Sequence, residues 1–203
     1  MTLILAEELG LDYELVIHKR DPFLSPQSIK DLNPLSQAPV IQDGDVTLPE
    51  SGAIVEYILQ KYGDGRLRFP PSHPNYAQYL YWFHFANGNL HPQLTRVMVL
   101  KLCNVNEEEW HAQRHFKHLV KFLQLIDKHL STNEWLVGSD STTADIMNVF
   151  SLTTMRAFSG LDLSEYPHIL EYLKRCTERD GYKRARAKGD PDLELMIDVK
   201  APA

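Results

Sequence analysis

The feature that most constrains the fold is a change of pattern about a third of the way along the 203-residue chain. Before residue 63, short apolar segments are separated by turn-forming residues; beyond residue 74, apolar residues recur at helical spacing over long stretches. The two parts are separated by Gly-Asp-Gly at 63–65 and a proline-rich stretch at 70–74, and such stretches are typical domain boundaries. The sequence therefore predicts a mixed α/β domain over residues 1–66 and an all-helical domain over residues 74–203.

Periodicity and turn signals predict the elements of the first domain. Residues 2–9 favour a helix that ends at Gly10, with Glu7 and Glu8 off its apolar face. The elements expected after it are a strand over 13–18, a loop with a short helical turn over 23–33, a strand over 38–42, a turn at Asp43-Gly44, a returning strand over 45–48 and a helix over 50–62. The residues expected to face inward in that last helix are Ile54, Val55, Ile58 and Leu59.

Only helices are predicted in the second domain. The expected helices are one over 76–102 with Trp82 and Phe85 in the core, one that follows an Asn106 cap, one opened by a capping box of Thr142 and Asp145 and continuing through Met155, and one over 167–179. The expected apolar stripe of the second helix is Phe116, Leu119, Val120, Leu123, Ile126 and Leu130. The basic run at 183–188 is interpreted as a solvated helix end.

Composition narrows the range of functions. The formal net charge is −6 and no long basic block offsets it, which argues against binding to nucleic acid or to an anionic membrane. Two cysteines, Cys103 and Cys176, are too few for a disulfide framework and are expected to act as small core residues. No apolar run is long enough to span a bilayer and no signal peptide is evident, so a cytoplasmic location is expected.

Three histidines are a possible metal site. His111, His115 and His118 share one face of a predicted helix, a spacing that could bind a metal ion. No carboxylate in a clear position completes the ligand set, and the neighbouring residues are polar. A wet helix surface is the preferred interpretation, and no metal is predicted.

Two segments carry the densest functional signal: NPLSQAPVI at 33–41 and LPESGAI at 48–54. By themselves they allow a plain interpretation, with Thr47 and Glu50 as a capping box and Pro39 as a strand-edge proline. Together they resemble the glutathione-binding half of the cytosolic glutathione S-transferase family, fungal and bacterial type. Further segments of this chain, EELGLDYE at 7–14, Val137-Gly138 and TTADI at 142–146, resemble the end of the family's first helix with its following strand, and its C-domain capping motif.

The resemblance implies a thioredoxin-like N-terminal domain, an all-helical C-terminal bundle and glutathione as co-substrate. A cis Ala38–Pro39 bond would let the Ala38 backbone pair with the cysteinyl part of the ligand like an added strand. Gln37 would hydrogen-bond the glycyl end and Glu50 would meet the ligand ammonium. Ser51, at a helix start, would bind a ligand carboxylate.

The resemblance begins inside the family's first helix. In the family, a first strand and a loop with the Ser, Tyr or Cys that stabilises the thiolate precede this helix. No residue of this sequence matches that position, so no catalytic residue is assigned. An inner strand would be missing from the sheet, and three explanations stay open: residues upstream, a partner chain that fills the gap, or a sheet that has closed up.

The resemblance implies addition of the glutathione thiolate to a hydrophobic electrophilic small molecule. A glutathione-dependent double-bond isomerase of fungal secondary metabolism and a non-catalytic glutathione-binding or regulatory module are the alternatives. The helix over 76–102 would form the wall of the second-substrate site, with His84, Asn87 and His91 as candidates. Arg156 or Phe158 could contribute from elsewhere. The family resemblance also implies a homodimer.

Overall fold

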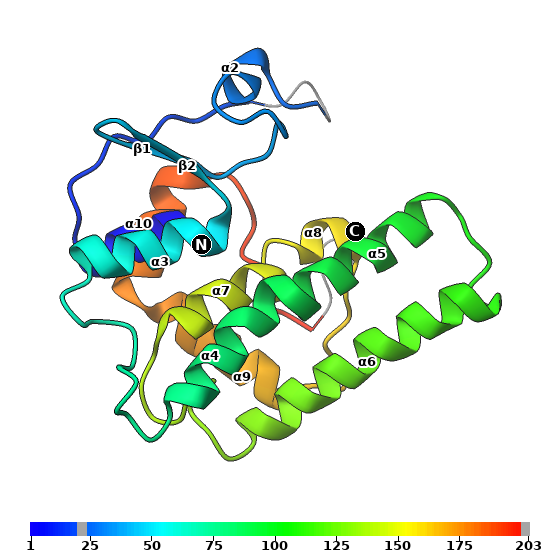
Figure 1. The fold of residues 1–203 in the computed structure, drawn as a ribbon. Helices are drawn as coiled ribbons and strands as arrows, with labels where there is room; N and C mark the ends of the chain where they lie inside the picture. Colours follow the sequence, from blue (N-terminus) through cyan, green and yellow to red (C-terminus); the bar gives the residue numbers. More distant parts are fainter. Residues whose placement is uncertain (20–23, 200–203) are drawn as a thin grey trace. The chain divides into compact units, whose positions relative to one another are not determined.

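The computed structural model describes residues 1–19 and 24–199, which form two compact units (Figure 1). The first unit consists of Met1–Arg66 together with Asp180–Pro191, and the second consists of Leu67–Arg179 together with the residues from Asp192 onward. The sequence-based boundary assigned 180–191 to the helical domain, whereas the structure packs this segment with the N-terminal residues. Pro22 and Phe23, at the start of the predicted loop, lie outside the described residues.

The first unit combines helices with one β-hairpin. Its elements are α1 (Thr2–Leu9), α2 (Gln27–Lys30), β1 (Val40–Asp43), β2 (Val46–Pro49), α3 (Ser51–Tyr62) and α10 (Asp180–Gly189). Helix α1 packs against both α10 and α3, and α3 packs against the hairpin. The predicted helix over 2–9 is confirmed, including its end at Gly10, which has the left-handed φ of 66° that glycine tolerates. The basic run at 183–188 does lie towards the end of a helix, but a separate helix over 180–189 was not among the predicted elements.

The hairpin is antiparallel and two-stranded among the described residues. Val40 pairs with Pro49 and Asp43 with Val46, so the turn falls at Gly44, whose φ is 59°. This confirms the Asp-Gly turn signal, with each strand displaced by one or two residues from its predicted bounds. The predicted helix after it is also confirmed, since Ile54, Val55, Ile58 and Leu59 are all buried.

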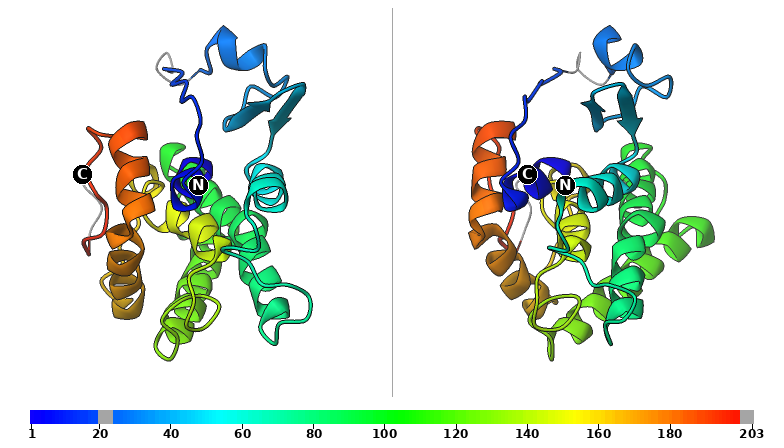
Figure 2. Two further views of the ribbon diagram at one scale, coloured as in Figure 1. Left: turned by 90° about the vertical axis from the view of Figure 1, so that its left-hand side faces the viewer. Right: turned by 60° about the vertical axis from the view of Figure 1, so that its left-hand side comes forward.

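The predicted strand over 13–18 is wrong. Residues 11–19 have no regular secondary structure, and Figure 2 draws them as a loop that leaves α1. The sequence has the apolar, β-branched character of a strand, but a strand requires a hydrogen-bonded neighbour. The backbone of residues 12–19 makes no hydrogen bond to another described residue, so the apolar run stays open to solvent.

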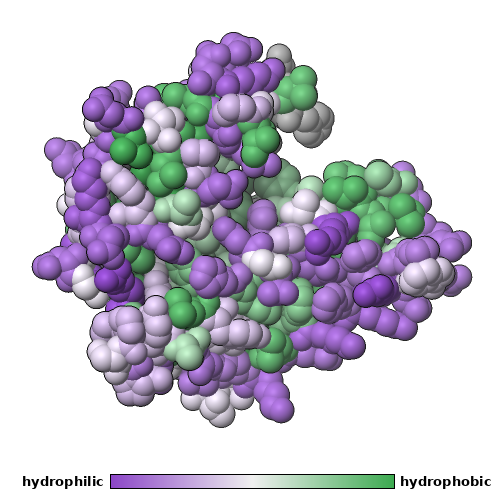
Figure 3. Space-filling view, in the orientation of Figure 1, coloured by the Kyte–Doolittle hydropathy of each residue, from purple (hydrophilic) through white to green (hydrophobic). Residues whose placement is uncertain are grey.

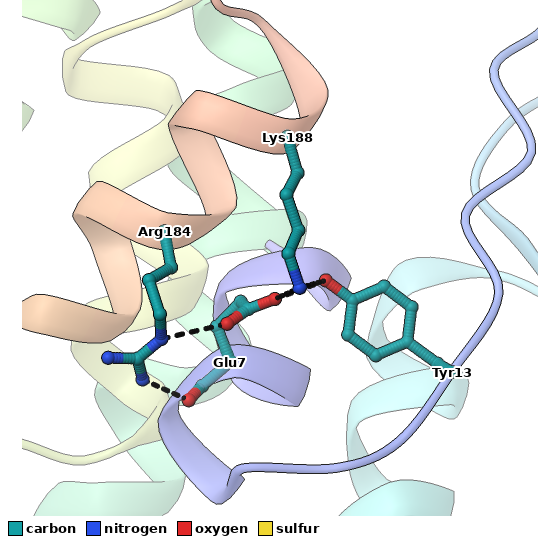
Figure 4. Close-up of polar contacts among 4 residues, drawn as sticks. All are labelled: Glu7, Tyr13, Arg184 and Lys188. Carbon is teal, nitrogen blue, oxygen red and sulfur yellow. Dashed lines mark hydrogen bonds and ion pairs between the residues drawn. The ribbon is translucent and has the colours of Figure 1, made fainter.

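Glu7 in α1 is buried, although the helical pattern placed it off the apolar face. Its carboxylate accepts hydrogen bonds from Arg184 Nε at 2.9 Å, from Lys188 Nζ and from the Tyr13 hydroxyl (Figure 4). Arg184 Nη2 also donates to the Glu7 carbonyl oxygen at 2.7 Å. A buried carboxylate is tolerated when cations and hydroxyls satisfy it in this way, so the cluster fastens α10 to α1.

A second charged cluster holds the turn of the hairpin against α3. Asp43 Oδ2 accepts hydrogen bonds from Lys61 Nζ at 2.7 Å, Tyr62 at 2.6 Å and Tyr57 at 2.9 Å. The Lys61 ammonium and then the two phenols lower the pKa of Asp43 to about 2. These contacts attach the turn of the hairpin to α3.

The second unit is all-helical. Its elements are α4 (Tyr76–Phe85), η1 (Ala86–Leu90), α5 (His91–Leu102), α6 (Trp110–Leu130), α7 (Thr143–Leu152), α8 (Arg156–Ser159) and α9 (Pro167–Glu178). The predicted helix over 76–102 is thus confirmed in extent, but η1 is a π-helical turn within it. Trp82 and Phe85 are buried, as expected.

The capping box of α7 is confirmed. Thr142 Oγ1 accepts from the Ala144 backbone N–H, and Asp145 accepts from the Thr142 backbone N–H at 2.8 Å. Asp145 is buried and also accepts from the Leu136 N–H and the Tyr172 hydroxyl. One side chain therefore links the start of α7 to the preceding loop and to α9.

Four expectations for the second unit are wrong. Helix α7 ends at Leu152 rather than continuing through Met155. Helix α6 begins at Trp110 because Asn106 instead accepts from the Glu108 N–H in a turn ahead of it. Val120 is 41% exposed, whereas Leu119 beside it faces the core. Cys103 is exposed because α5 ends at Leu102; only Cys176 is buried.

Arg156 in α8 is buried and holds the C-terminal segment of the second unit. Its guanidinium donates to the carbonyl oxygens of Leu161 at 3.1 Å, Met196 at 3.1 Å and Val199 at 2.9 Å. Burial lowers the pKa of this guanidinium. The Leu163 N–H also donates to Val199, so the segment is attached through its backbone.

Apolar residues collect at one place on the surface of the second unit. Val99, Leu102 and Val105, at the C-terminal end of α5, are 47%, 72% and 37% exposed, and Figure 3 shows a hydrophobic patch at this end of the helix. Among the described residues, none of the helices combines the length and apolar character needed to cross a membrane.

Candidate functional site

Both sequence motifs lie at the same end of the hairpin. Because Val40, the first residue of β1, pairs with Pro49, the last residue of β2, the chain before β1 and the chain after β2 are neighbours. Gln37-Ala38-Pro39 therefore enters the hairpin at the place where Glu50-Ser51 leaves it. This end lies opposite the turn that Asp43 fastens to α3. The register alone thus brings together all five residues predicted to bind glutathione.

The loop before β1 is held by Asn33, a buried residue to which the sequence analysis gave no role. Its side-chain amide donates to the Gln37 carbonyl oxygen at 2.9 Å, and its Oδ1 accepts from the Leu35 N–H at 3.0 Å. The Ser36 N–H donates to the Asn33 carbonyl at 2.7 Å. The Asn-Pro pair at 33–34 is a turn signal that could have revealed this role. Asn33 fixes the backbone that leads into Ala38.

Ala38 presents its backbone at the surface. The Ala38–Pro39 peptide bond is cis, as the resemblance implies, and Ala38 is exposed. Its N–H and C=O make no hydrogen bond to another described residue. An extended peptide could pair with these two groups as a further strand would. Gln37 is exposed beside it.

Glu50 occupies the N-cap position of α3 in an unusual conformation. Its φ of 74° and ψ of 110° lie outside the regions that residues other than glycine ordinarily adopt. Its side chain is exposed, makes no capping hydrogen bond, and is paired with no other described residue. Backbone strain of this kind concentrates at active sites and ligand-binding sites.

Ser51 is the first residue of α3 and is half-buried. The first turn of a helix directs backbone N–H groups and a partial positive charge outward, and this turn contains no acidic residue. A ligand carboxylate suits such a position. The plain interpretation of Thr47 and Glu50 as a capping box is wrong, because Thr47 lies within β2 and the helix starts four residues later.

Comparison with known proteins decides the family. The model of the glutathione S-transferase N-terminal domain matches residues 2–66, and the model of the C-terminal domain matches residues 91–180. The chain is 32% identical to Glutathione S-transferase 3 of Schizosaccharomyces pombe, an alignment that covers 96% of this chain and 85% of the relative. The chain belongs to the glutathione S-transferase family. Residues 2–66 match the family's thioredoxin-like N-terminal domain, and residues 91–180 match its helical C-terminal domain.

Solved structures agree on the fold of this glutathione S-transferase. A glutathione S-transferase from Actinobacillus pleuropneumoniae has a TM-score of 0.82, with 28% identity over 97% of this chain and 88% of that one. A glutathione transferase from Phanerochaete chrysosporium, solved with oxidized glutathione, has a TM-score of 0.72 with 24% identity and covers 91% of this chain and 86% of its own. These similarities show that the chain has the fold of a glutathione S-transferase.

The second-substrate candidates of this transferase lie along the interrupted helix of the second unit. His84 in α4 and Asn87 in η1 are exposed, and His91 opens α5. The His91 ring is half-buried, lies 3.4 Å from Ser151 Oγ through Nδ1, and packs near the Phe150 ring. Burial lowers the pKa of His91, which favours the neutral imidazole. The π-turn between them, which no sequence signal indicated, is typical of functional sites in helices.

The two further candidates, Arg156 and Phe158, differ in their exposure to solvent. Arg156 is fully buried, and its guanidinium already donates to three backbone carbonyl oxygens. It is therefore not available to a substrate, and its proposed contribution to the second-substrate site is wrong. Phe158 is 64% exposed and remains available.

His111, His115 and His118 belong to no group of three or more metal-ligand side chains among the described residues. His118 instead packs on Phe122.

Proposed function

We propose that this chain binds glutathione at the open end of the β1–β2 hairpin. The observation that carries the proposal is the register that puts Gln37-Ala38-Pro39 and Glu50-Ser51 at one end, with the Glu50 carboxylate unpaired among the described residues. Glutathione has an ammonium and two carboxylates along an extended peptide. Glu50 would meet the ammonium and Ser51 the neighbouring carboxylate. The Ala38 backbone would pair with the cysteinyl unit and Gln37 with the glycyl end.

The proposed reaction is transfer of glutathione to a hydrophobic electrophile. The thiolate attacks an electrophilic carbon, a carbon–sulfur bond forms, and a leaving group such as chloride departs with the bonding electrons. His84, Asn87 and His91 are proposed to contact the second substrate, as part of a homodimer. Support comes from the family, from the relative solved with oxidized glutathione and from the π-turn at these residues.

Turnover is tested with glutathione and a nitro-activated aryl chloride, following chloride displacement by absorbance. Saturable conjugation by this chain is expected. Glutathione binding without conjugation, and without isomerisation of a conjugated cis enone, would contradict the transferase proposal and favour a binding module. Isomerisation without conjugation would reassign the thiolate to reversible addition, in which it adds to the double bond, allows rotation and leaves.

Glu50→Ala and Ser51→Ala are each expected to weaken glutathione binding by about 1–3 kcal/mol, roughly 5- to 150-fold, because each removes a charge-assisted contact to the ligand. Titration calorimetry measures the change. Glu56→Ala is the matched control, since this exposed residue of α3 removes the same charge from the same helix. Unchanged affinity in both variants, or an equal loss with the control, would contradict the assigned site.

A further inference from the structure

The imidazole of His91 has one nitrogen engaged and one nitrogen open. Nδ1 lies 3.4 Å from the Ser151 hydroxyl oxygen, across the contact between α5 and α7. Nε2 makes no hydrogen bond to another described residue, and it is not among the buried atoms that lack a partner, so it is accessible to solvent. The ring is half-buried and its centroid lies 5.7 Å from that of Phe150. One edge of the imidazole is therefore held by α7 and the other is open.

The Ser151 hydroxyl decides which nitrogen of His91 carries the proton. Ser151 is buried, and within the described part of the chain its hydroxyl has no hydrogen-bond partner besides Nδ1. A buried hydroxyl proton without an acceptor is costly, so the hydroxyl donates to Nδ1. Burial also lowers the pKa of His91, which favours the neutral ring. The single proton of the neutral imidazole then lies on Nε2.

The backbone of His91 is fixed at the place where the π-turn η1 ends and α5 begins. Its N–H donates to the Ala86 carbonyl oxygen, and its own carbonyl oxygen accepts from Thr95 Oγ1 at 3.0 Å. A side chain on such an element, with its ring held by a further hydrogen bond, needs little rearrangement when a ligand binds. The open Nε2–H is thus a rigid, uncharged hydrogen-bond donor on the surface of the second unit.

We propose that the Nε2–H group of His91 donates a hydrogen bond to a nitro or carbonyl oxygen of the second substrate, and that Ser151 is the positioning residue that keeps the proton on Nε2. The inference rests on the proposed transferase function and adds the chemistry of one contact. An uncharged donor suits an oxygen that is neutral in the substrate and gains negative charge when the thiolate attacks.

The contact strengthens during the reaction without any proton transfer. In dinitrophenyl chloride, the carbon–sulfur bond forms while an electron pair of the ring moves onto a nitro oxygen, where Nε2–H stabilises it. The pair then returns to the ring, and chloride leaves with the electrons of the carbon–chlorine bond. An electrophile such as benzyl chloride has no oxygen to accept the hydrogen bond, so His91 favours the first kind of substrate over the second.

Conjugation of glutathione with dinitrophenyl chloride and with benzyl chloride tests the contact. His91→Leu is expected to lower kcat for dinitrophenyl chloride about tenfold to a hundredfold and to leave kcat for benzyl chloride within about twofold, because the donor acts on charge that develops only on the nitro oxygen. His91→Gln keeps an N–H donor at a similar reach and is expected to recover most of the loss. His118→Leu, which removes an exposed histidine of α6, is the control and is expected to change neither rate.

Nitrogen NMR of histidine-labelled protein measures the protonation of the ring directly, with the His91 signals identified by their loss in His91→Leu. The Nε2–H form is expected in the wild type. Ser151→Ala is expected to give a mixture of both neutral forms and a severalfold lower kcat for dinitrophenyl chloride alone.

Three results would overturn the role of His91 while leaving the transferase proposal intact. They are a proton on Nδ1 in the wild type, an equal loss of kcat on both substrates in His91→Leu, and no loss on either. A wild-type chain that conjugates neither substrate would instead contradict the transferase function, and the role of His91 would fail with it.

Discussion

Replacing Arg156 with alanine is expected to lower the free energy of unfolding by about 4 kcal/mol. Three carbonyl oxygens, of Leu161, Met196 and Val199, lose their charged donor, and a large buried side chain leaves a cavity. A hydrogen bond to a charged group contributes roughly 1.5–3 kcal/mol, and neighbouring losses are not additive. Urea denaturation followed by tryptophan fluorescence measures the effect.

Two companion variants separate the hydrogen bonds from general effects of losing an arginine. Arg156→Lys keeps the charge but not the planar fork of donors, so an intermediate loss is expected. Arg114→Ala removes an exposed arginine of α6 and is expected to change stability by no more than about 0.5 kcal/mol. The C-terminal segment should also become susceptible to limited proteolysis in Arg156→Ala alone. A loss below about 1 kcal/mol would show that these carbonyls do not depend on the guanidinium.

Glu7→Gln is expected to destabilise the protein by about 3 kcal/mol at pH 7, because it removes the anion that Arg184 and Lys188 share in a buried position. The hydrogen bonds from Lys188, Tyr13 and Arg184 outweigh burial and lower the pKa of Glu7 to about 2. A carboxyl whose pKa is lower in the folded state stabilises the protein above its unfolded pKa of about 4.5 and loses that contribution as the pH falls towards 2.

The difference between wild type and Glu7→Gln should therefore shrink steadily between pH 4.5 and pH 2, as measured by urea denaturation at successive pH values. Glu56→Gln, exposed in α3, is the control and should show neither the loss at neutral pH nor the acid dependence. A difference that is independent of pH would mean that Glu7 acts through packing rather than through its charge.

The features predicted most reliably are those that depend on residues close together in the sequence. The Asp43-Gly44 turn, the apolar face of α3 and the capping box of Thr142 and Asp145 depend on residues within a few positions of one another. The two motifs at 33–41 and 48–54 could also be recognised in the sequence, because the turn and the strand register that bring them together are local. Asn33 was missed, although its turn to Gln37 is equally short.

Long-range contacts explain the errors. Glu7 is buried by partners 177 and 181 positions away, which no periodicity could reveal. Those partners lie on α10, a helix rich in Lys and Arg whose attachment depends on charge as well as on an apolar face. The segment after α1 has the composition of a strand, but pairing depends on a neighbour that composition does not supply.

The central claim is that the hairpin end recognises the γ-glutamyl part of glutathione through Glu50 and Ser51, and the cysteinyl part through Ala38. Titration calorimetry of the chain with glutathione, and separately with cysteinylglycine, tests it most directly. Binding of one glutathione per chain is expected, with affinity at least roughly tenfold weaker for cysteinylglycine, which lacks the γ-glutamyl unit and the charges that Glu50 and Ser51 would meet. Equal affinity for the two peptides, or no heat of binding with glutathione, would contradict the account.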